Sequence, residues 1–266
     1  MTIDDAVAVG QRRFGDLEVV VAPDGAALGR LAAYEATRVL RAAISARGEA
    51  RVIVATGNSQ LAFFRALREG HDVDWSRVRV FHMDEYVGIA ADHPASFRAF
   101  LRRELIGPLR IGHFHPIDPD PSDPGRTIAG YGSLLARHPA DLTCMGIGEN
   151  GHLAFNDPPV ADFDDPATLK VVALDERSRM QQVGEGHFPD LAAVPTTAIT
   201  LTIPALLAPP RALVIVPEAR KAAAVARALT GEISTACPAS ILRRAGHATL
   251  YLDVESAALI GDAGGP

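Results

Sequence analysis

The chain has 266 residues, of which 48% are hydrophobic, and it carries a formal net charge of −6. This length and apolar content suffice for one large core, so we expect a single domain over residues 1–266. The acidic balance and the lack of basic stretches exclude a nucleic-acid-binding surface and a polybasic membrane patch. No apolar run reaches the ~18 residues of a membrane-spanning helix, and the acidic start, MTIDDAVAVG, does not read as a signal peptide. We therefore expect a cytoplasmic protein.

Short apolar runs alternate with longer helical patterns along the chain. The strand candidates are LEVVVA (17–22), RVIVA (51–55), VRVFHM (78–83), DLTCMGI (141–147), LKVVAL (169–174), AITLTI (198–203), ALVIV (212–216) and TLYLD (249–253). Apolar residues at helical spacing predict helices over 26–45 and 218–229. Strands with little polar alternation, separated by helices, are typical of a mostly parallel sheet covered on both faces. The predicted fold class is α/β, a three-layer α/β/α sandwich.

The chain has only two cysteines, Cys144 and Cys237, and no C-x-x-C. This count predicts neither a disulfide framework nor a zinc or thioredoxin-type redox site. Cys144 lies in an apolar run, where we expect a buried thiol.

Ligands of such sheets bind beyond the carboxyl ends of the strands. That rule selects four loops, ATGNS (55–59), HMDEY (82–86), GIGENGH (146–152) and VPEARK (216–221). The first offers a close turn and small donors at the start of a helix, an arrangement that suits an anion but also an ordinary helix cap. Its residues are Thr56, Gly57, Asn58 and Ser59. Lys221, in the last loop, is either a second anion contact or a solvated lysine.

The loop HMDEY places Asp84 and Glu85 at the end of a strand. Adjacent residues there point apart, so they would not act as a carboxylate pair. We expect one to face the site while the other makes a structural hydrogen bond, although a turn or a helix cap is an alternative.

The loop after 141–147 has the spacing G-x-G-x-x-G, formed by Gly146, Gly148 and Gly151. A dinucleotide site needs a helix after the third glycine, but Pro158 and Pro159 leave room for barely two turns. His152 can move protons near neutral pH, and a nearby carboxylate can orient its ring. Together with Asn156 and Asp157, it favours a catalytic loop over a cofactor loop.

Taken together, these loops resemble those of the glucosamine-6-phosphate deaminase (isomerase) family, which is related to 6-phosphogluconolactonase. The matching segments are VATGNSQLAFFRAL (54–67), VFHMDEYVGIAADHPASFRAFL (80–101), GIGENGHLAFNDP (146–158), VPTTAITLTIPALL (194–207) and VPEARKAAAV (216–225). The resemblance implies a Rossmann-like sheet of the sugar-phosphate isomerase type. It implies a sugar-phosphate substrate and needs no metal and no cofactor. Members range from monomers to hexamers, so a homo-oligomer stays open.

The resemblance also implies residue roles. Asp84 is similar to the base that moves a proton between C2 and C1, and His152 to the acid/base that opens the sugar ring. Asn150 and Asp157 are similar to the residues that support the histidine. The implied phosphate and substrate contacts are Thr56, Gly57, Asn58, Ser59, Glu85, Gly151, Arg179 and Lys221.

Three positions depart from the family pattern. Asp157 stands where the deaminases carry Glu, so its reach to His152 is open to test. Gln60 replaces a frequent Pro. The segment VADFDDPAT (160–168) lacks the Ser and Arg that bind the activator N-acetylglucosamine 6-phosphate in regulated members, so we predict no such activation.

Alternative functions remain at this stage. Asp157 and the stretch QQVGEGHF (181–188) are compatible with galactosamine 6-phosphate as the substrate, or with isomerisation without loss of the amine. A sugar-phosphate sensor would need neither Asp84 nor His152. Phosphogluconolactonases typically read GHTASLFP where this chain reads GHLAFNDP. A dependence on NAD fits the glycine loop poorly.

Overall fold

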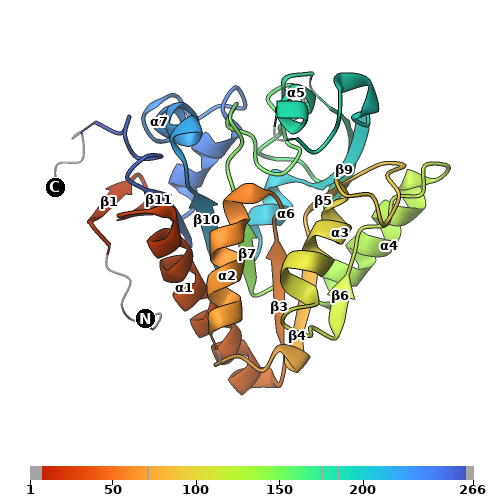
Figure 1. Cartoon of the computed structure of the whole chain (residues 1–266), viewed down its shortest axis with the longest axis horizontal. Helices are drawn as coiled ribbons and strands as arrows, with labels where there is room; N and C mark the ends of the chain where they lie inside the picture. Colours follow the sequence, from red (N-terminus) through yellow and green to blue (C-terminus); the bar gives the residue numbers. More distant parts are fainter. Residues whose placement is uncertain (1–7, 71, 175, 185, 262–266) are drawn as a thin grey trace.

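The computed structural model describes residues 8–70, 72–174, 176–184 and 186–261, and an eight-stranded sheet forms its centre (Figure 1). The strand order is β1-β2-β11-β10-β7-β3-β4-β6, and neighbours are parallel except for β1 and β2. The strands are β1 (Gly10–Phe14), β2 (Leu17–Ala22), β3 (Ala50–Val54), β4 (Val78–His82), β6 (His113–His115), β7 (Leu142–Met145), β10 (Ala212–Val216) and β11 (Ala248–Asp253). The predicted mostly parallel sheet is confirmed.

Successive side chains of the central strands enter two separate hydrophobic cores, one on each face of the sheet. In β10, Val214 and Val216 join the first core, while Leu213 and Ile215 join the second. Helices α4 (Pro124–Arg137), α6 (Ile203–Leu207) and α7 (Ala222–Thr230) contribute to the first core; α1 (Gly25–Arg47), α2 (Leu61–Glu69) and α3 (Phe97–Leu101) contribute to the second. This arrangement confirms the predicted α/β/α sandwich.

Helices α1 and α2 lie side by side on one face (Figure 1). The Asp24 carboxylate caps α1 by accepting a hydrogen bond from the Ala27 N–H at 2.7 Å. A Cβ at position 29 would lie 2.6 Å from the Ala62 carbonyl oxygen, so only glycine allows the two helices to approach this closely. The packing fixes α2, whose first residues follow the turn at 55–60.

Two predicted strands lie outside the main sheet. β8 (Leu169–Ala173) and β9 (Thr197–Leu201), expected at 169–174 and 198–203, pair antiparallel with each other, and β5 (Asp84–Tyr86) pairs antiparallel with β9. Apolar runs do not reveal which strand they pair with, so the sequence could not separate this small sheet from the large one. Helix α5 (Glu176–Gly184) lies at the upper end of the molecule in Figure 1, with β9 below it.

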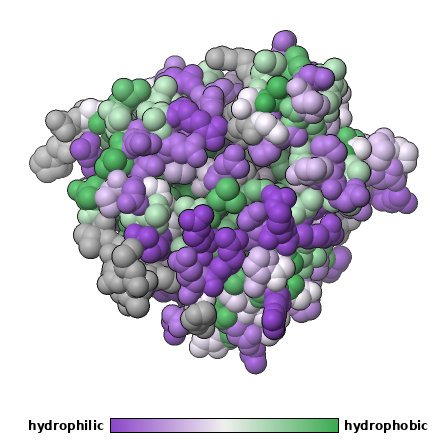
Figure 2. Space-filling view, viewed as in Figure 1, coloured by the Kyte–Doolittle hydropathy of each residue, from purple (hydrophilic) through white to green (hydrophobic). Residues whose placement is uncertain are grey.

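The surface of the described residues is mixed in character. On the face shown in Figure 2, hydrophilic and hydrophobic residues are interspersed. The large exposed hydrophobic side chains come from several elements and are Val9, Tyr34, Val171, Met180, Val254 and Leu259. None of the described helices combines the length and the apolar character needed to cross a membrane. The N-terminal residues 1–7 lie outside the described part of the chain.

Candidate functional site

The loops that follow four neighbouring strands line one cavity at the carboxyl edge of the main sheet. The strands are β10, β7, β3 and β4, in their order across the sheet. Each of the four loops selected from the sequence contributes lining residues. These include Thr56, Gly57, Asn58, Ser59, Met83, Asp84, Gly146, Ile147, Gly148, His152, Arg220 and Lys221. From β3 the chain continues to β4, whereas the strand that follows β7 in the main sheet is β10, on the other side. The site therefore lies where the strand order reverses, and ligands of open α/β sheets bind at such a point.

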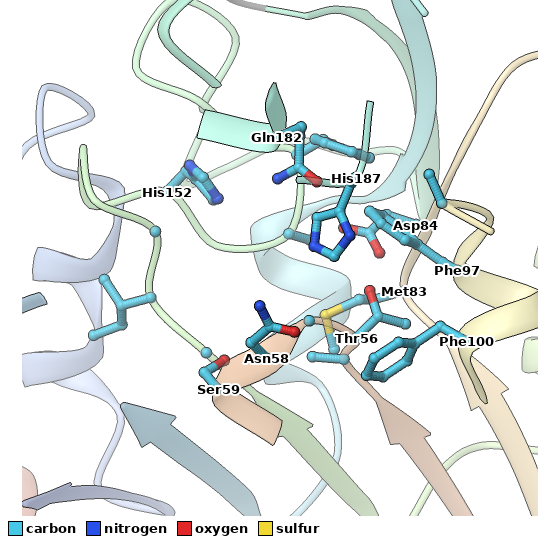
Figure 3. A pocket seen from close by; sticks show the side chains of 18 of the residues that line it. Thr56, Asn58, Ser59, Met83, Asp84, Phe97, Phe100, His152, Gln182 and His187 are labelled. Atoms are coloured by element: carbon cyan, nitrogen blue, oxygen red, sulfur yellow. The ribbon is translucent and has the colours of Figure 1, made fainter. Parts of the chain in front are cut away.

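The cavity has polar groups on several sides and an apolar wall (Figure 3). His152 and Asp84 approach it from different sides in this view, and Thr56, Asn58 and Ser59 lie below them. The apolar lining comes from Ala55, Met83, Pro94, Ala95, Phe97, Phe100, Ile147, Ala154 and Phe155. A ligand here can contact a carboxylate, an imidazole and a cluster of small polar groups at the same time.

Asp84 is a buried carboxylate that faces the cavity. The residue is only 6% exposed, and it lines the cavity. Burial raises the pKa of Asp84 well above its ordinary value, and the neighbouring carboxylate of Glu85 raises this pKa further. A carboxylate in this setting holds a proton more strongly than one in water, which suits a group that must take up a proton from carbon.

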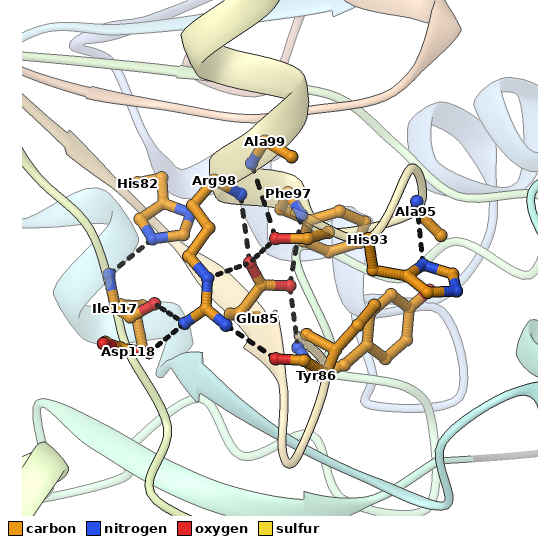
Figure 4. Close-up of polar contacts among 12 residues, drawn as sticks. His82, Glu85, Tyr86, His93, Ala95, Phe97, Arg98, Ala99, Ile117 and Asp118 are labelled. Carbon is orange, nitrogen blue, oxygen red and sulfur yellow. Dashed lines mark hydrogen bonds and ion pairs between the residues drawn. The ribbon is translucent and has the colours of Figure 1, made fainter. Parts of the chain in front are cut away.

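Glu85 points away from the cavity into a hydrogen-bond network (Figure 4). Its carboxylate accepts hydrogen bonds from the Ser96 hydroxyl at 2.9 Å and from the Arg98 N–H at 3.0 Å. The N–H groups of Tyr86 and Phe97 also donate to it, each at 3.1 Å. The expected separation of the two acidic residues is therefore present, but Glu85 anchors the start of α3 and does not line the cavity. The substrate contact anticipated for Glu85 has no support in this geometry.

Asn150 and Asp157 hold the His152 ring from one side. The Nδ1 atom of His152 lies 2.8 Å from Asn150 Oδ1 and 3.1 Å from Asp157 Oδ1. The amide of Asn150 also donates to Asp157 Oδ1 at 2.7 Å, which fixes Asn150 Oδ1 as an acceptor. Two acceptors at Nδ1 favour the tautomer with hydrogen on Nδ1, leaving Nε2 to exchange a proton with a ligand. The shorter Asp157 thus reaches the histidine, although neither Asn150 nor Asp157 lines the cavity.

Gly148 makes room for the His152 ring, whereas Gly151 makes room for Cys237. A Cβ at Gly148 would lie 2.1 Å from the His152 ring, and one at Gly151 would lie 2.7 Å from the Cys237 sulfur. Gly151 has φ +93° and does not line the cavity, so its contribution is to the backbone path. Residues 150–168 form turns and an isolated bridge, with no helix to receive a pyrophosphate.

The turn after β3 and the start of α7 form the part of the cavity best suited to an anion. Gly57 adopts φ +95°, with the small polar side chains of Asn58 and Ser59 following it. Lys221, directly before α7, also lines the cavity and is 5% exposed. Gln60 donates to the Ser59 hydroxyl at 3.2 Å and to the Ile215 carbonyl at 3.4 Å. The residue that replaces the frequent Pro therefore ties this turn to the end of β10.

Arg179 lies elsewhere. Its guanidinium donates to the carbonyl oxygens of Leu191 at 2.6 Å and Val194 at 3.0 Å, and it does not line the cavity. The expected phosphate contact of Arg179 is therefore not supported here. Arg179 lies outside the segments that match the family pattern, and a helical position alone does not reveal where a long side chain points.

Sequence reasoning missed three polar lining residues, Gln182, His187 and Arg220. The first two belong to the stretch 181–188 that stood out in the sequence, and Arg220 precedes Lys221 in VPEARK. Position 185 and the side chain of Gln181 lie outside the described part of that stretch. Within the described residues, no group of three or more His, Cys, Asp or Glu side chains has the arrangement of a metal site.

Comparison with known proteins places this fold and site in a class. The family model for glucosamine-6-phosphate isomerases and 6-phosphogluconolactonase matches residues 23–251. The chain therefore belongs to this enzyme family.

The relatives and the solved structure compared next are all glucosamine-6-phosphate deaminases. The glucosamine-6-phosphate deaminase of Exiguobacterium sibiricum is 34% identical over 209 residues, which cover 79% of this chain and 81% of the relative. That of Streptomyces avermitilis is 34% identical over 243 residues, which cover 89% and 90%. The solved structure of a monomeric glucosamine-6-phosphate deaminase matches with a TM-score of 0.83 at 26% identity, covering 91% of this chain and 99% of that one.

Proposed function

We propose that this chain is a glucosamine-6-phosphate deaminase. The reaction converts glucosamine 6-phosphate and water into fructose 6-phosphate and ammonia. The observation that carries the proposal is the pairing, in one cavity, of the buried Asp84 carboxylate with the oriented His152 imidazole, beside a turn suited to phosphate. Relatives that share about a third of the sequence bear this name.

His152 opens the sugar ring in this proposal. Its Nε2 takes the proton from the C1 hydroxyl and delivers it to the ring oxygen O5, which breaks the C1–O5 bond and leaves an aldehyde at C1. Asn150 and Asp157 stabilise the imidazolium that forms, because both present oxygen atoms to Nδ1. The aldehyde makes the proton on C2 acidic enough for a carboxylate to remove.

Asp84 then moves the proton from C2 to C1. Asp84 removes the proton from C2 while the ammonium group on C2 passes a proton to the C1 oxygen, which gives an enolamine. Return of the proton from Asp84 to C1 gives an iminium at C2. Water adds to C2, and cleavage of the C–N bond releases ammonia and leaves the ketone. The raised pKa of Asp84 suits this shuttle, because the base must both take and return the proton.

The phosphate binds away from the reacting carbons. We assign it to the turn at Thr56, Gly57, Asn58 and Ser59, with Lys221 supplying a positive charge. Binding energy at this end can orient the C1 and C2 atoms between the two catalytic groups. We further propose that the whole chain works as one domain and that it acts in the cytoplasm, where a charged sugar phosphate is retained.

Two variants test the roles. We expect His152→Gln to lose turnover of the cyclic substrate while an open-chain substrate analogue still exchanges its C2 proton with solvent. Asp84→Asn should lose both activities and still bind the sugar phosphate. Turnover by Asp84→Asn would remove this residue from the role of base.

A second candidate is a sibling activity on galactosamine 6-phosphate, or isomerisation without loss of the amine. The specific observation in its favour is that Gln182 and His187, from the stretch 181–188, line the cavity. These side chains add hydrogen-bonding groups that can select among sugar hydroxyls. Parallel assays with both amino-sugar phosphates separate the candidates.

A further inference from the structure

The turns after β3 and β10 have the same backbone plan. In the first, Gly57 has φ +95° and ψ 167°, a short 3-10 turn follows, and α2 begins at Leu61. In the second, Glu218 has φ +83° and ψ 139°, a 3-10 turn follows, and α7 begins at Ala222. In both, the carbonyl of the positive-φ residue accepts a 3.0 Å hydrogen bond from the N–H three residues later. The second turn thus places Glu where the first has Gly.

This position is unfavourable for a residue with a side chain, and surrounding contacts hold Glu218 there. Its N–H donates to the Asp253 carboxylate, 3.0 Å from Oδ2, and Asp253 is 4% exposed. Its own carboxylate accepts a hydrogen bond from Arg220 Nε at 2.5 Å. A glycine would relieve the backbone but would leave Arg220 without this carboxylate. The strained residue therefore contributes through its side chain.

Arg220 lines the cavity next to Lys221, and a second carboxylate also holds it. Its Nη1 lies 3.3 Å from Glu149 Oε1, and Glu149 belongs to the loop that carries His152. The Arg220 side chain is 31% exposed. A guanidinium has five N–H donors in a planar fork, so it can contact carboxylates and a further anion at the same time.

We propose that Arg220 is an additional phosphate-binding residue that selects ligands with a phosphate end, and that Glu218 and Glu149 are its positioning residues. This inference rests on the proposed function, since it names the end of the substrate that Arg220 recognises. Lys221 supplies a compact charge, whereas the fork of Arg220 matches two phosphate oxygens. The ion pair between Arg220 and Glu149 links the phosphate contact to the loop that carries His152.

The test compares Arg220→Gln with Arg227→Gln. Arg227 is exposed and does not line the cavity. Its guanidinium donates to the backbone oxygen of the same Glu149 at 3.2 Å. Both variants therefore remove one positive charge near the loop that carries His152. Affinities for fructose 6-phosphate and for inorganic phosphate are measured by calorimetry, together with KM and kcat for glucosamine 6-phosphate. We expect Arg220→Gln to weaken both affinities and to raise KM by about ten- to a hundred-fold, the size of a lost charged hydrogen bond. Arg227→Gln should bind like the parent protein, and Arg220→Lys should recover part of the affinity.

Two results would overturn the proposal. Unchanged affinity of Arg220→Gln for both phosphate ligands would remove Arg220 from the binding site. A fall in kcat with unchanged affinities would mean that Arg220 only positions the His152 loop and does not bind phosphate. The binding measurements need no turnover, so a parent protein that binds fructose 6-phosphate but releases no ammonia would contradict the proposed function and leave the assignment of Arg220 intact.

Discussion

Asp84 occupies a place where its charged form is costly. Burial and the adjacent Glu85 raise its pKa, so the folded protein binds this proton more tightly than the unfolded chain does. The stability contribution of Asp84 therefore falls as pH rises from the ordinary aspartate pKa, about 3.9, through the raised value. Above that window, the whole cost of the buried charge is present.

Asp84→Asn removes this cost together with the base. We expect the variant to be more stable than the parent protein at neutral pH by about 1–3 kcal/mol, because a neutral amide replaces a poorly solvated carboxylate. At about pH 3.5, which is below the pKa of Asp84 in both the unfolded and the folded state, the two proteins should be equally stable. Urea unfolding at both pH values measures the difference. Equal or lower stability of the variant at neutral pH would contradict a raised pKa at this residue.

Asp157 tests whether the site is built for the shorter side chain. Its carboxylate already lies 3.1 Å from His152 Nδ1, and the residue is 1% exposed. The extra methylene of Asp157→Glu must push against a packed interior, at a cost of about 1–3 kcal/mol. We expect lower kcat and lower stability, measured by steady-state kinetics and thermal unfolding. A gain in activity would show that the family residue is better even here.

At the scale of the element, glycines in the 146–152 loop leave room for neighbouring side chains. A Cβ at Gly148 meets the His152 ring, whereas a Cβ at Gly151 meets Cys237 at a backbone with φ +93°. A ring at the end of a side chain can move aside, but a left-handed backbone cannot easily change. The two glycines should therefore respond differently to alanine.

We expect Gly148→Ala to fold nearly as stably as the parent protein but to lose about 10²–10⁴-fold in kcat, the usual contribution of a positioned acid/base. Gly151→Ala should instead lose stability, because alanine is strained at positive φ. Chemical denaturation and kinetics of both variants separate the effects. Full activity of Gly148→Ala would mean that the His152 ring does not need its present position.

Much of this element-level picture could be predicted from the sequence. Strand-to-helix alternation gave the parallel sheet, and the rule for its carboxyl edge selected the loops that line the cavity. The opposite directions of Asp84 and Glu85 followed from strand geometry. The pairing of β8 with β9 could not be predicted, since apolar runs do not encode their partners. The location of Arg179 depends on side-chain direction, which spacing does not fix.

At the scale of the whole molecule, the segment 160–168 bears on regulation. It lacks the Ser and Arg that the family resemblance associates with an activator site, and it forms turns with exposed or half-buried residues. We expect N-acetylglucosamine 6-phosphate to leave both kcat and KM for the substrate unchanged. Initial rates with and without this effector measure the response. A clear rise in rate or affinity would show that another part of the chain binds it.

The most direct test of the central claim is release of ammonia and fructose 6-phosphate from glucosamine 6-phosphate, with galactosamine 6-phosphate assayed in parallel and no metal or cofactor added. The cavity formed by Asp84, His152 and the Thr56–Ser59 turn predicts release of both products, in equal amounts, from glucosamine 6-phosphate. Release from galactosamine 6-phosphate alone would move the assignment to the epimer. No release from either compound, by a protein that still binds fructose 6-phosphate, would contradict the proposed deaminase.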